Sequence, residues 1–177
     1  SSEFRRKHDI FEKSLPKAFS VITNCEIIKK RISFFYRVLE EKIFIVNHQP
    51  SKPIEEFDKL DNLKLSEIRS KFNLPENYIF YPAMYLPHKN HISVIDALKI
   101  LKVKNSKNLK LVFCGNDIGY LQNLKDYTKK LNLDKDVFFL NFVKDEYLPY
   151  LYHDSFVLVM PSLIGPTNIP PWEAFKM

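Results

Sequence analysis

Residues 109–115 read L-K-L-V-F-C-G, a short apolar run that ends at a glycine. A run of this length bounded by turn residues is typical of a strand that is buried on both faces of a sheet. Similar apolar runs and intervening helical stretches follow one another in the second half of the chain, with strands at 78–81, 137–140 and 156–160 and helices at 92–103, 120–131, 146–152 and 169–176. This alternation indicates βαβ units. The sequence therefore predicts an α/β fold with a parallel, Rossmann-like sheet covered by helices on both faces.

The first 50 residues repeat the alternation on a smaller scale. Two helices and two short strands are expected there, the helices at 3–14 and 26–35 and the strands at 18–23 and 42–46. Residues 51–74 carry many charges without a clear apolar period, so we interpret them as a linker or loop. We expect residues 1–50 to be the end of one α/β domain and residues 75–177 to be most of another, truncated at its C-terminus, within a longer protein.

Composition excludes several classes of protein. Only 3 of the 177 residues are glycine, and their spacing forms neither G-x-G-x-x-G nor a Walker loop, which argues against a nicotinamide Rossmann enzyme and a P-loop ATPase. The sequence has no apolar run of about 18 residues that would span a membrane. No apolar stretch follows the charges of its first residues, so we do not expect these residues to be a signal peptide. Cys25 and Cys114 lie far apart in apolar surroundings and are expected to be reduced.

The loops that follow the strands are the candidate site, because ligands of open parallel sheets bind at the carboxyl ends of the strands. Lys89 lies in such a loop close to a helix N-terminus, where it would attract an anion unless it is an ordinary surface lysine. Gly115 allows a ligand or another backbone segment to approach, or it marks only a turn. The backbone at Phe142 and Val143 is a weak candidate for contact with a flat base.

The loop at 161–174 is the most informative, and it reads P-S-L-I-G-P-T-N-I-P-P-W-E-A with Gly165 at its centre. Its adjacent prolines suit the first turn of a helix, where an amide hydrogen would be unpaired. The backbone amides just before these prolines can bind phosphate or sugar oxygens; they belong to Thr167, Asn168 and Ile169. Glu173 in the same first turn either caps the helix or binds the hydroxyls of a sugar ring.

Two segments carry a resemblance to a known family, Lys-Asn-His at 89–91 and the loop at 161–174. They resemble the donor-binding domain of retaining GT-B glycosyltransferases of family 4, also called glycosyl transferases group 1. The similarity covers roughly residues 78–177, and residues 18–49 resemble the end of the N-terminal domain of that family. It implies an incomplete GT-B C-terminal domain and a hexosyltransferase that moves a sugar from a nucleotide-diphosphate donor, with retention, as in polysaccharide biosynthesis.

The resemblance also assigns residues. Lys89 matches the lysine that binds the donor diphosphate, and Glu173 matches the glutamate that holds the ribose hydroxyls. The backbone stretch near the phosphates and the sugar corresponds to Thr167, Asn168 and Ile169.

The sequence departs from the family pattern at two places. The glycine-arginine pair is replaced by Ala83-Met84, so one phosphate cation is missing. Gly165 stands where the family has a first glutamate, so that contact with the donor sugar must come from elsewhere.

We expect no metal site, because the pair His88 and His91 has no nearby carboxylate or cysteine to complete one. We also expect no cofactor.

The expected partners are a nucleotide sugar and a glycan or lipid-linked acceptor. The net charge of +6 makes an anionic membrane face a further candidate partner. Nucleic acid is not expected as a partner, because the lysines are scattered along the sequence. The whole protein would be cytoplasmic, with peripheral attachment to the inner membrane face as an option. The chain alone would be inactive, and a non-catalytic nucleotide-sugar binding module is the alternative.

Overall fold

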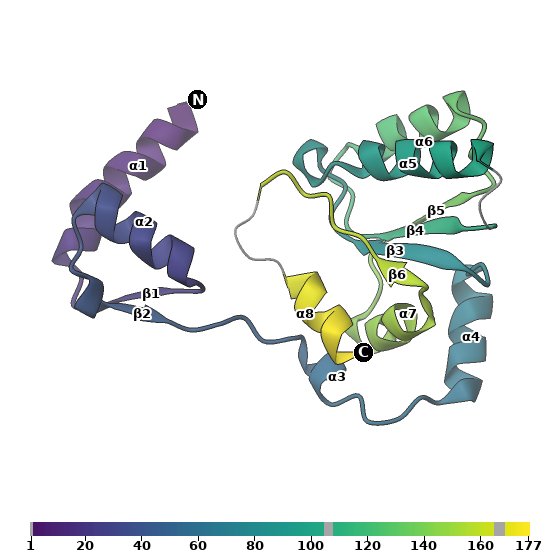
Figure 1. Ribbon diagram of the computed structural model, residues 1–177, viewed down its shortest axis with the longest axis horizontal. Coiled ribbons are helices and arrows are strands. Elements are labelled where there is room, and N and C mark those ends of the chain that lie inside the picture. Colours follow the sequence, from purple (N-terminus) through teal and green to yellow (C-terminus); the bar gives the residue numbers. More distant parts are fainter. Residues whose placement is uncertain (1, 105–107, 165–168) are drawn as a thin grey trace. The chain divides into compact units, whose positions relative to one another are not determined.

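The computed structural model describes residues 2–104, 108–164 and 169–177 and contains two compact units (Figure 1). The first unit contains the described residues up to Gln49, with elements α1 (Ser2–Ser14), β1 (Val21–Thr23), α2 (Glu26–Tyr36) and β2 (Ile43–Ile45). β1 and β2 pair in parallel, with Val21 opposite Ile43. The expected alternation of helices and strands in this part of the chain is confirmed.

The second unit contains the described residues from Pro50 onward. Its elements are, in chain order, α3 (Lys52–Glu55), α4 (Asn62–Phe72), β3 (Tyr78–Pro82), α5 (His91–Val103), β4 (Lys110–Cys114), α6 (Leu121–Lys130), β5 (Val137–Leu140), α7 (Leu148–Asp154), β6 (Val157–Leu158) and α8 (Ile169–Lys176). The four strands form a parallel sheet in the order β5-β4-β3-β6. The predicted α/β class with a parallel sheet is therefore confirmed.

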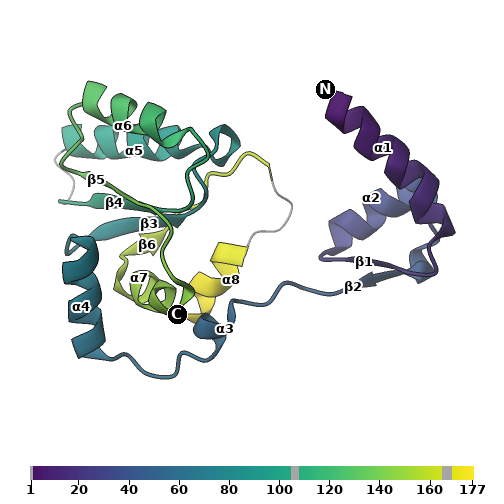
Figure 2. The same ribbon diagram turned by 180° about the vertical axis from the view of Figure 1, so that it is seen from behind.

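Helices cover both faces of this sheet, as Figures 1 and 2 show. The alternation of side chains along a strand sends Ile79 and Tyr81 of β3 toward α5 and α6, in one apolar cluster. Tyr78 and Phe80 of the same strand lie in a second cluster with residues of α3, α4 and α7. The middle strands are apolar on both sides because both sides are buried, as expected for a parallel sheet.

The segment at 51–74 differs from the expected linker, because it contains α3 and α4. Ile54 of α3 and Ile68 of α4 are almost fully buried in the second cluster. α4 is capped by Asp61, whose carboxylate accepts hydrogen bonds from the amides of Leu63 and Lys64. The segment is thus part of the second unit rather than a bare connection.

β6 is shorter than the strand expected at 156–160. It pairs only with Ile79 and Phe80 of β3, and Val157 at this edge is 42% exposed. The apolar run that predicted the longer strand continues into the loop that carries Pro161, where the pairing has ended.

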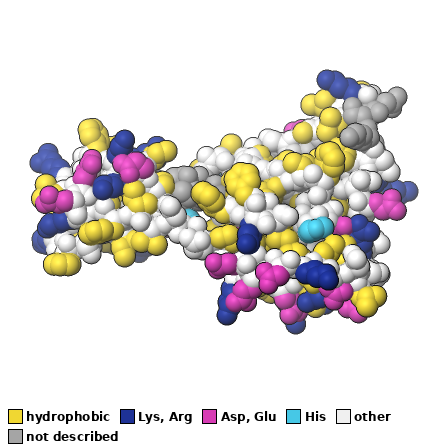
Figure 3. All heavy atoms as spheres, turned by 60° about the horizontal axis from the view of Figure 1, so that its bottom comes forward, with side chains coloured by type: hydrophobic (Ala, Val, Ile, Leu, Met, Phe, Trp, Pro, Cys, Tyr) yellow, Lys and Arg dark blue, Asp and Glu magenta, His cyan; other side chains and the backbone are white. Residues whose placement is uncertain are grey.

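Many apolar side chains of the first unit are exposed. Phe34 and Phe35 of α2 are 79% and 63% exposed, and Figure 3 shows hydrophobic side chains among the charged ones on this unit. The helix expected at 26–35 is present as α2, and no residue of α2 is buried in this structure. None of the helices in the described ranges is long and apolar enough to cross a bilayer.

Gly115 marks a close approach of two backbone segments. A Cβ atom built at this position would lie 2.2 Å from the carbonyl oxygen of Ala83 and 2.8 Å from the amide nitrogen of Met84. The loop that follows β3 therefore crosses directly over the end of β4. Of the alternatives left open by the sequence, the approach of another backbone segment is the one observed.

We expect Gly115→Ala to lower the free energy of unfolding by about 1–3 kcal/mol, because backbone atoms must move to admit the methyl group. Chemical denaturation of the 177-residue chain measures this. Asn123→Ala on the exposed side of α6 is the control and should change stability by less than about 0.5 kcal/mol. A Gly115→Ala chain as stable as this control would show that the loop is not packed on β4.

Candidate functional site

Four loops meet at the carboxyl edge of the sheet of the second unit. The parallel register places Pro82 of β3 opposite Cys114 of β4, and Cys114 opposite Leu140 of β5. β6 is paired with β3 in the same direction. The loops after all four strands therefore leave the sheet at one edge, which is where the sequence predicted a ligand site.

The loop after β3 is anchored on the neighbouring strands. The amide of Ala83 donates to the carbonyl of Cys114 at 2.8 Å, and the amide of Tyr85 donates to the carbonyl of Asn116 at 3.0 Å. The Tyr85 side chain is fully buried, and its hydroxyl lies 2.6 Å from the carbonyl oxygen of Leu140. Tyr85 thereby closes the end of the sheet and fixes the start of the loop.

Lys89 ends a short 3₁₀ turn, Pro87–Lys89, directly before α5. Its carbonyl oxygen accepts a hydrogen bond of 2.9 Å from the hydroxyl of Tyr81. The Lys89 side chain is partly exposed, and no carboxylate among the described residues forms an ion pair with its ammonium group. Lys102 and Lys110 differ, because both pair with the carboxylate of Asp136.

The loops after β3 and β6 are bonded to each other. The amide of Leu163 donates to the carbonyl of His88 at 2.9 Å. The side-chain amide of Asn90 donates to the carbonyl of Pro161 at 3.3 Å. The structure thus brings together Lys89 and the start of the loop at 161–174, two candidates that lie more than 70 residues apart in the sequence.

His91 is the first residue of α5 and is almost completely buried among Tyr81, Tyr85 and Phe113. Burial lowers the pKa of His91 to about 4, although the nearby Ala83 backbone acts in the opposite direction. His91 is therefore uncharged at neutral pH and belongs to the core. Among the described residues, no cluster of three or more His, Cys, Asp or Glu side chains is placed to hold a metal ion.

The loops after β4 and β5 show less sign of a ligand site. Asp117 caps α6, because its carboxylate accepts hydrogen bonds from the amides of Gly119, Tyr120 and Leu121. After β5, Phe142 is 66% exposed, whereas Val143 is buried in the second cluster. Of these two residues only Phe142 has a side chain that can face a base, and that contact stays a prediction.

Glu173 lies in α8 and is buried, with 6% of its surface exposed. Its Oε2 accepts a hydrogen bond of 2.6 Å from the hydroxyl of Tyr152, and its Oε1 accepts one of 3.3 Å from the amide of Ser51. Burial and the neighbouring carboxylate raise the pKa of Tyr152, so this hydroxyl remains a donor. These two partners were not visible in the sequence, because they lie 21 and 122 residues away from Glu173.

Three further predicted residues, Gly165, Thr167 and Asn168, lie outside the described residues. Ile169 is the first residue of α8 and is 40% exposed, so its amide is at the helix N-terminus as expected. α8 packs against α3 and α7. The contact of this helix start with phosphate or sugar is untested and stays a prediction.

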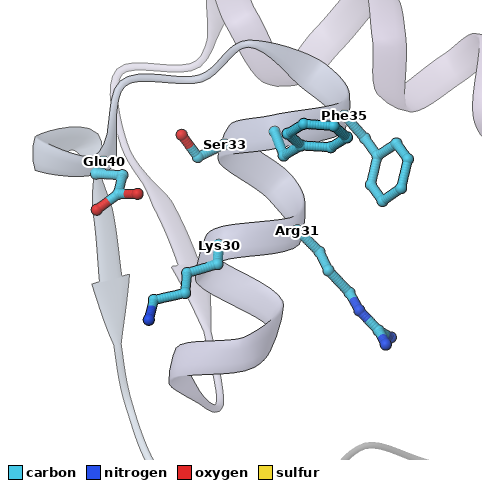
Figure 4. Close-up of a pocket in the computed structure, with 6 residues that line it drawn as sticks. Lys30, Arg31, Ser33, Phe35 and Glu40 are labelled. Atoms are coloured by element: carbon cyan, nitrogen blue, oxygen red, sulfur yellow. The ribbon is translucent and has the colours of Figure 1, made fainter.

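The first unit has a hollow of its own, of about 450 Å³. It is lined by Lys30, Arg31, Ser33, Phe34, Phe35 and Glu40, most of which are labelled in Figure 4. None of the residues predicted for donor binding lies in it. Its basic and aromatic lining differs from that of the strand-end loops of the second unit. The two sequence motifs, at 89–91 and 161–174, contain none of the residues that line this hollow.

Comparison with protein families gives a match over residues 65–177, more than half of the chain, to the family described as "Glycosyl transferases group 1". The chain belongs to this family. The matched range begins inside α4 and includes all four strands of the sheet and all the candidate residues. The resemblance to glycosyl transferases group 1 that the sequence carries is thereby confirmed.

Individual relatives agree with this membership. The O-antigen chain mannosyltransferase RfbU of Salmonella typhimurium strain LT2 is 29% identical over 165 residues, which cover 93% of this chain and 42% of the relative. The serotype-specific mannosyltransferase WbdA of Escherichia coli is 23% identical over 177 residues, or 99% of this chain and 20% of the relative.

Among solved structures, Anabaena Alr3699/HepE in complex with UDP and glucose superposes with a TM-score of 0.82 at 18% identity. The match covers 99% of this chain and 48% of that protein, and it supports the GT-B glycosyltransferase fold. The chain thus spans less than half the length of each of these three proteins.

The bond from Tyr152 to Glu173 yields a prediction. Tyr152→Phe leaves a buried carboxylate oxygen with one donor fewer, and we expect a loss of about 1–3 kcal/mol in unfolding free energy. The matched control is Tyr147→Phe, which removes only the exposed contact between that hydroxyl and Lys71. Equal denaturation curves for both variants would show that Glu173 is not held in the way described.

Proposed function

We propose that the chain is the donor-binding part of a glycosyltransferase that moves a hexosyl group from a nucleoside-diphosphate sugar, with retention, to a glycan or lipid-linked acceptor. The observation that carries the proposal is the junction of the two loops at 87–90 and 161–163. Lys89 lies in the first of these loops, at the carboxyl edge of a parallel sheet, and it forms no ion pair with a carboxylate among the described residues.

The charges fit a leaving diphosphate. Breaking a sugar–phosphate bond leaves negative charge on the diphosphate, and a fixed lysine together with a helix N-terminus stabilises that charge. Lys89 is available because no described carboxylate neutralises it, and His91 is uncharged. In this proposal the reaction needs no metal ion or cofactor, since Lys89 and the amides at the start of α8, including that of Ile169, bind the phosphates.

Glu173 is proposed to bind the ribose hydroxyls. Each carboxylate oxygen can accept two hydrogen bonds. The bond from the Tyr152 hydroxyl orients the group, while the contact of 3.3 Å from the Ser51 amide is long and can give way to a hydroxyl. Two relatives are named mannosyltransferases, which supports mannose as the hexose. The acceptor would bind to parts of the longer protein, so we expect no sugar transfer by this chain alone.

We expect the 177-residue chain to bind a nucleoside diphosphate, and Lys89→Ala to weaken this binding by about 1.5–3 kcal/mol, the value of a hydrogen bond to a charged group. Isothermal titration with UDP and with GDP, in excess EDTA, measures the affinity.

Lys129→Ala is the matched control, because it removes an exposed lysine at the end of α6 and should leave the affinity unchanged. Equal affinities of Lys89→Ala and the unaltered chain would refute the assignment of Lys89. Binding that is lost in EDTA and restored by magnesium or manganese would refute the metal-free proposal.

The first unit supports an anionic membrane face as a further partner. Most of the excess positive charge of the chain falls in its first 49 residues. Lys30 and Arg31 line the same hollow as the exposed side chains of Phe34 and Phe35. Basic and aromatic side chains together favour the surface of an anionic bilayer.

We expect the chain to sediment with vesicles that contain phosphatidylglycerol and not with pure phosphatidylcholine vesicles. The double change Lys30→Ala/Arg31→Ala should reduce the bound fraction severalfold, whereas Lys129→Ala/Lys130→Ala on α6 should not. Binding that is insensitive to salt, or equal for both vesicle types, would contradict an electrostatic membrane contact.

A further inference from the structure

Asn90 stands between Lys89 and α5 in a backbone conformation that few residues adopt. Its φ is +58°, in the left-handed region, where glycine and asparagine are tolerated best. The backbone amide of Asn90 donates a hydrogen bond of 3.0 Å to the carbonyl oxygen of Pro87, and this bond closes the short turn that contains Lys89. Conformation alone would therefore be satisfied by glycine at this position.

The Asn90 side chain does more than permit the turn. Its Nδ2 donates to the carbonyl oxygen of Pro161 at 3.3 Å, and its Oδ1 accepts a bond of 2.8 Å from the hydroxyl of Ser93. One carboxamide thus bonds to the first turn of α5 on one side and to the loop after β6 on the other. Glycine would provide neither bond.

These bonds flank Lys89 along the chain. The carbonyl oxygen of His88, before Lys89, accepts a hydrogen bond from the backbone amide of Leu163. The side-chain amide of Asn90, after Lys89, donates one to the carbonyl oxygen of Pro161. The Lys89 carbonyl is itself held by the hydroxyl of Tyr81. Both neighbours of Lys89 are therefore hydrogen-bonded to the loop after β6. The bond at His88 joins backbone groups, whereas the bond at Asn90 depends on a side chain.

We propose that Asn90 is a positioning residue of the donor site: its carboxamide ties the Lys89 turn to the loop after β6, so that the Lys89 ammonium and that loop face the same diphosphate. This inference rests on the proposed function, since it assumes that Lys89 binds the diphosphate. Asn90 acts through Lys89 and does not itself contact the ligand.

The test is a double-mutant cycle on nucleoside-diphosphate affinity in the 177-residue chain, measured with whichever of UDP and GDP binds more tightly. Asn90→Gly retains the left-handed turn and removes both side-chain bonds. We expect it to weaken binding by about three- to tenfold, the value of one hydrogen bond. In a Lys89→Ala background the same change should have almost no effect, because coupled residues are not additive. Ser93→Ala, the control, removes only the bond within the helix start and should alter affinity less than twofold.

Each result is informative. Full affinity of Asn90→Gly would mean that only the turn conformation matters, and an equal loss in both backgrounds would mean that Asn90 does not act through Lys89; either overturns the inference. No effect of Lys89→Ala would instead overturn the proposed function. A second readout needs no ligand: hydrogen exchange at the Leu163 amide should be faster in Asn90→Gly than in Ser93→Ala, and equal exchange would overturn the tie between the loops.

Discussion

The parallel pairing of β3 with both β4 and β6 is the constraint on which the candidate site depends. Because the strands run in one direction, the loop that carries Lys89 and the loop that begins at Pro161 leave the sheet at the same edge. The close approach of Gly115 to Ala83 and the buried hydroxyl of Tyr85 then fix the first loop on the ends of β4 and β5. The hydrogen bond from Leu163 to His88 joins the second loop to it.

The lysines at the carboxyl ends of the strands differ in their pairing from those elsewhere in the second unit. Away from the site, Lys102 and Lys110 share the carboxylate of Asp136 and contribute to the structure. At the edge, Lys89 has no such partner among the described residues, and burial keeps His91 uncharged. An unpaired cation at a strand end is of little use to stability, since exposed charges add little to folding. It is suited to an anionic ligand.

The sequence was sufficient for the number and order of the described strands, though not for the length of β6, and for the fold class and the family, because apolar runs and the motif at 161–174 are local signals. α4 was missed, although Leu65, Ile68 and Phe72 have helical spacing, because the surrounding charges obscured the apolar side of the helix. The partners of Glu173 could not be predicted, since Ser51 and Tyr152 meet it only through packing of α3, α7 and α8. The role proposed for Asn90 could not be predicted from the sequence, because it is inferred from the backbone φ angle of Asn90 and from its hydrogen bond to Pro161.

The central claim is that the edge of the sheet at Lys89 binds the diphosphate of a nucleotide sugar. A crystal structure of the chain with UDP or GDP tests it most directly. The account predicts a phosphate oxygen at about 2.7–2.9 Å from the Lys89 ammonium, the distance of a charge-assisted hydrogen bond, with the ribose beside Glu173. A nucleotide seated instead in the basic hollow lined by Lys30 and Arg31, with Lys89 free, would contradict it.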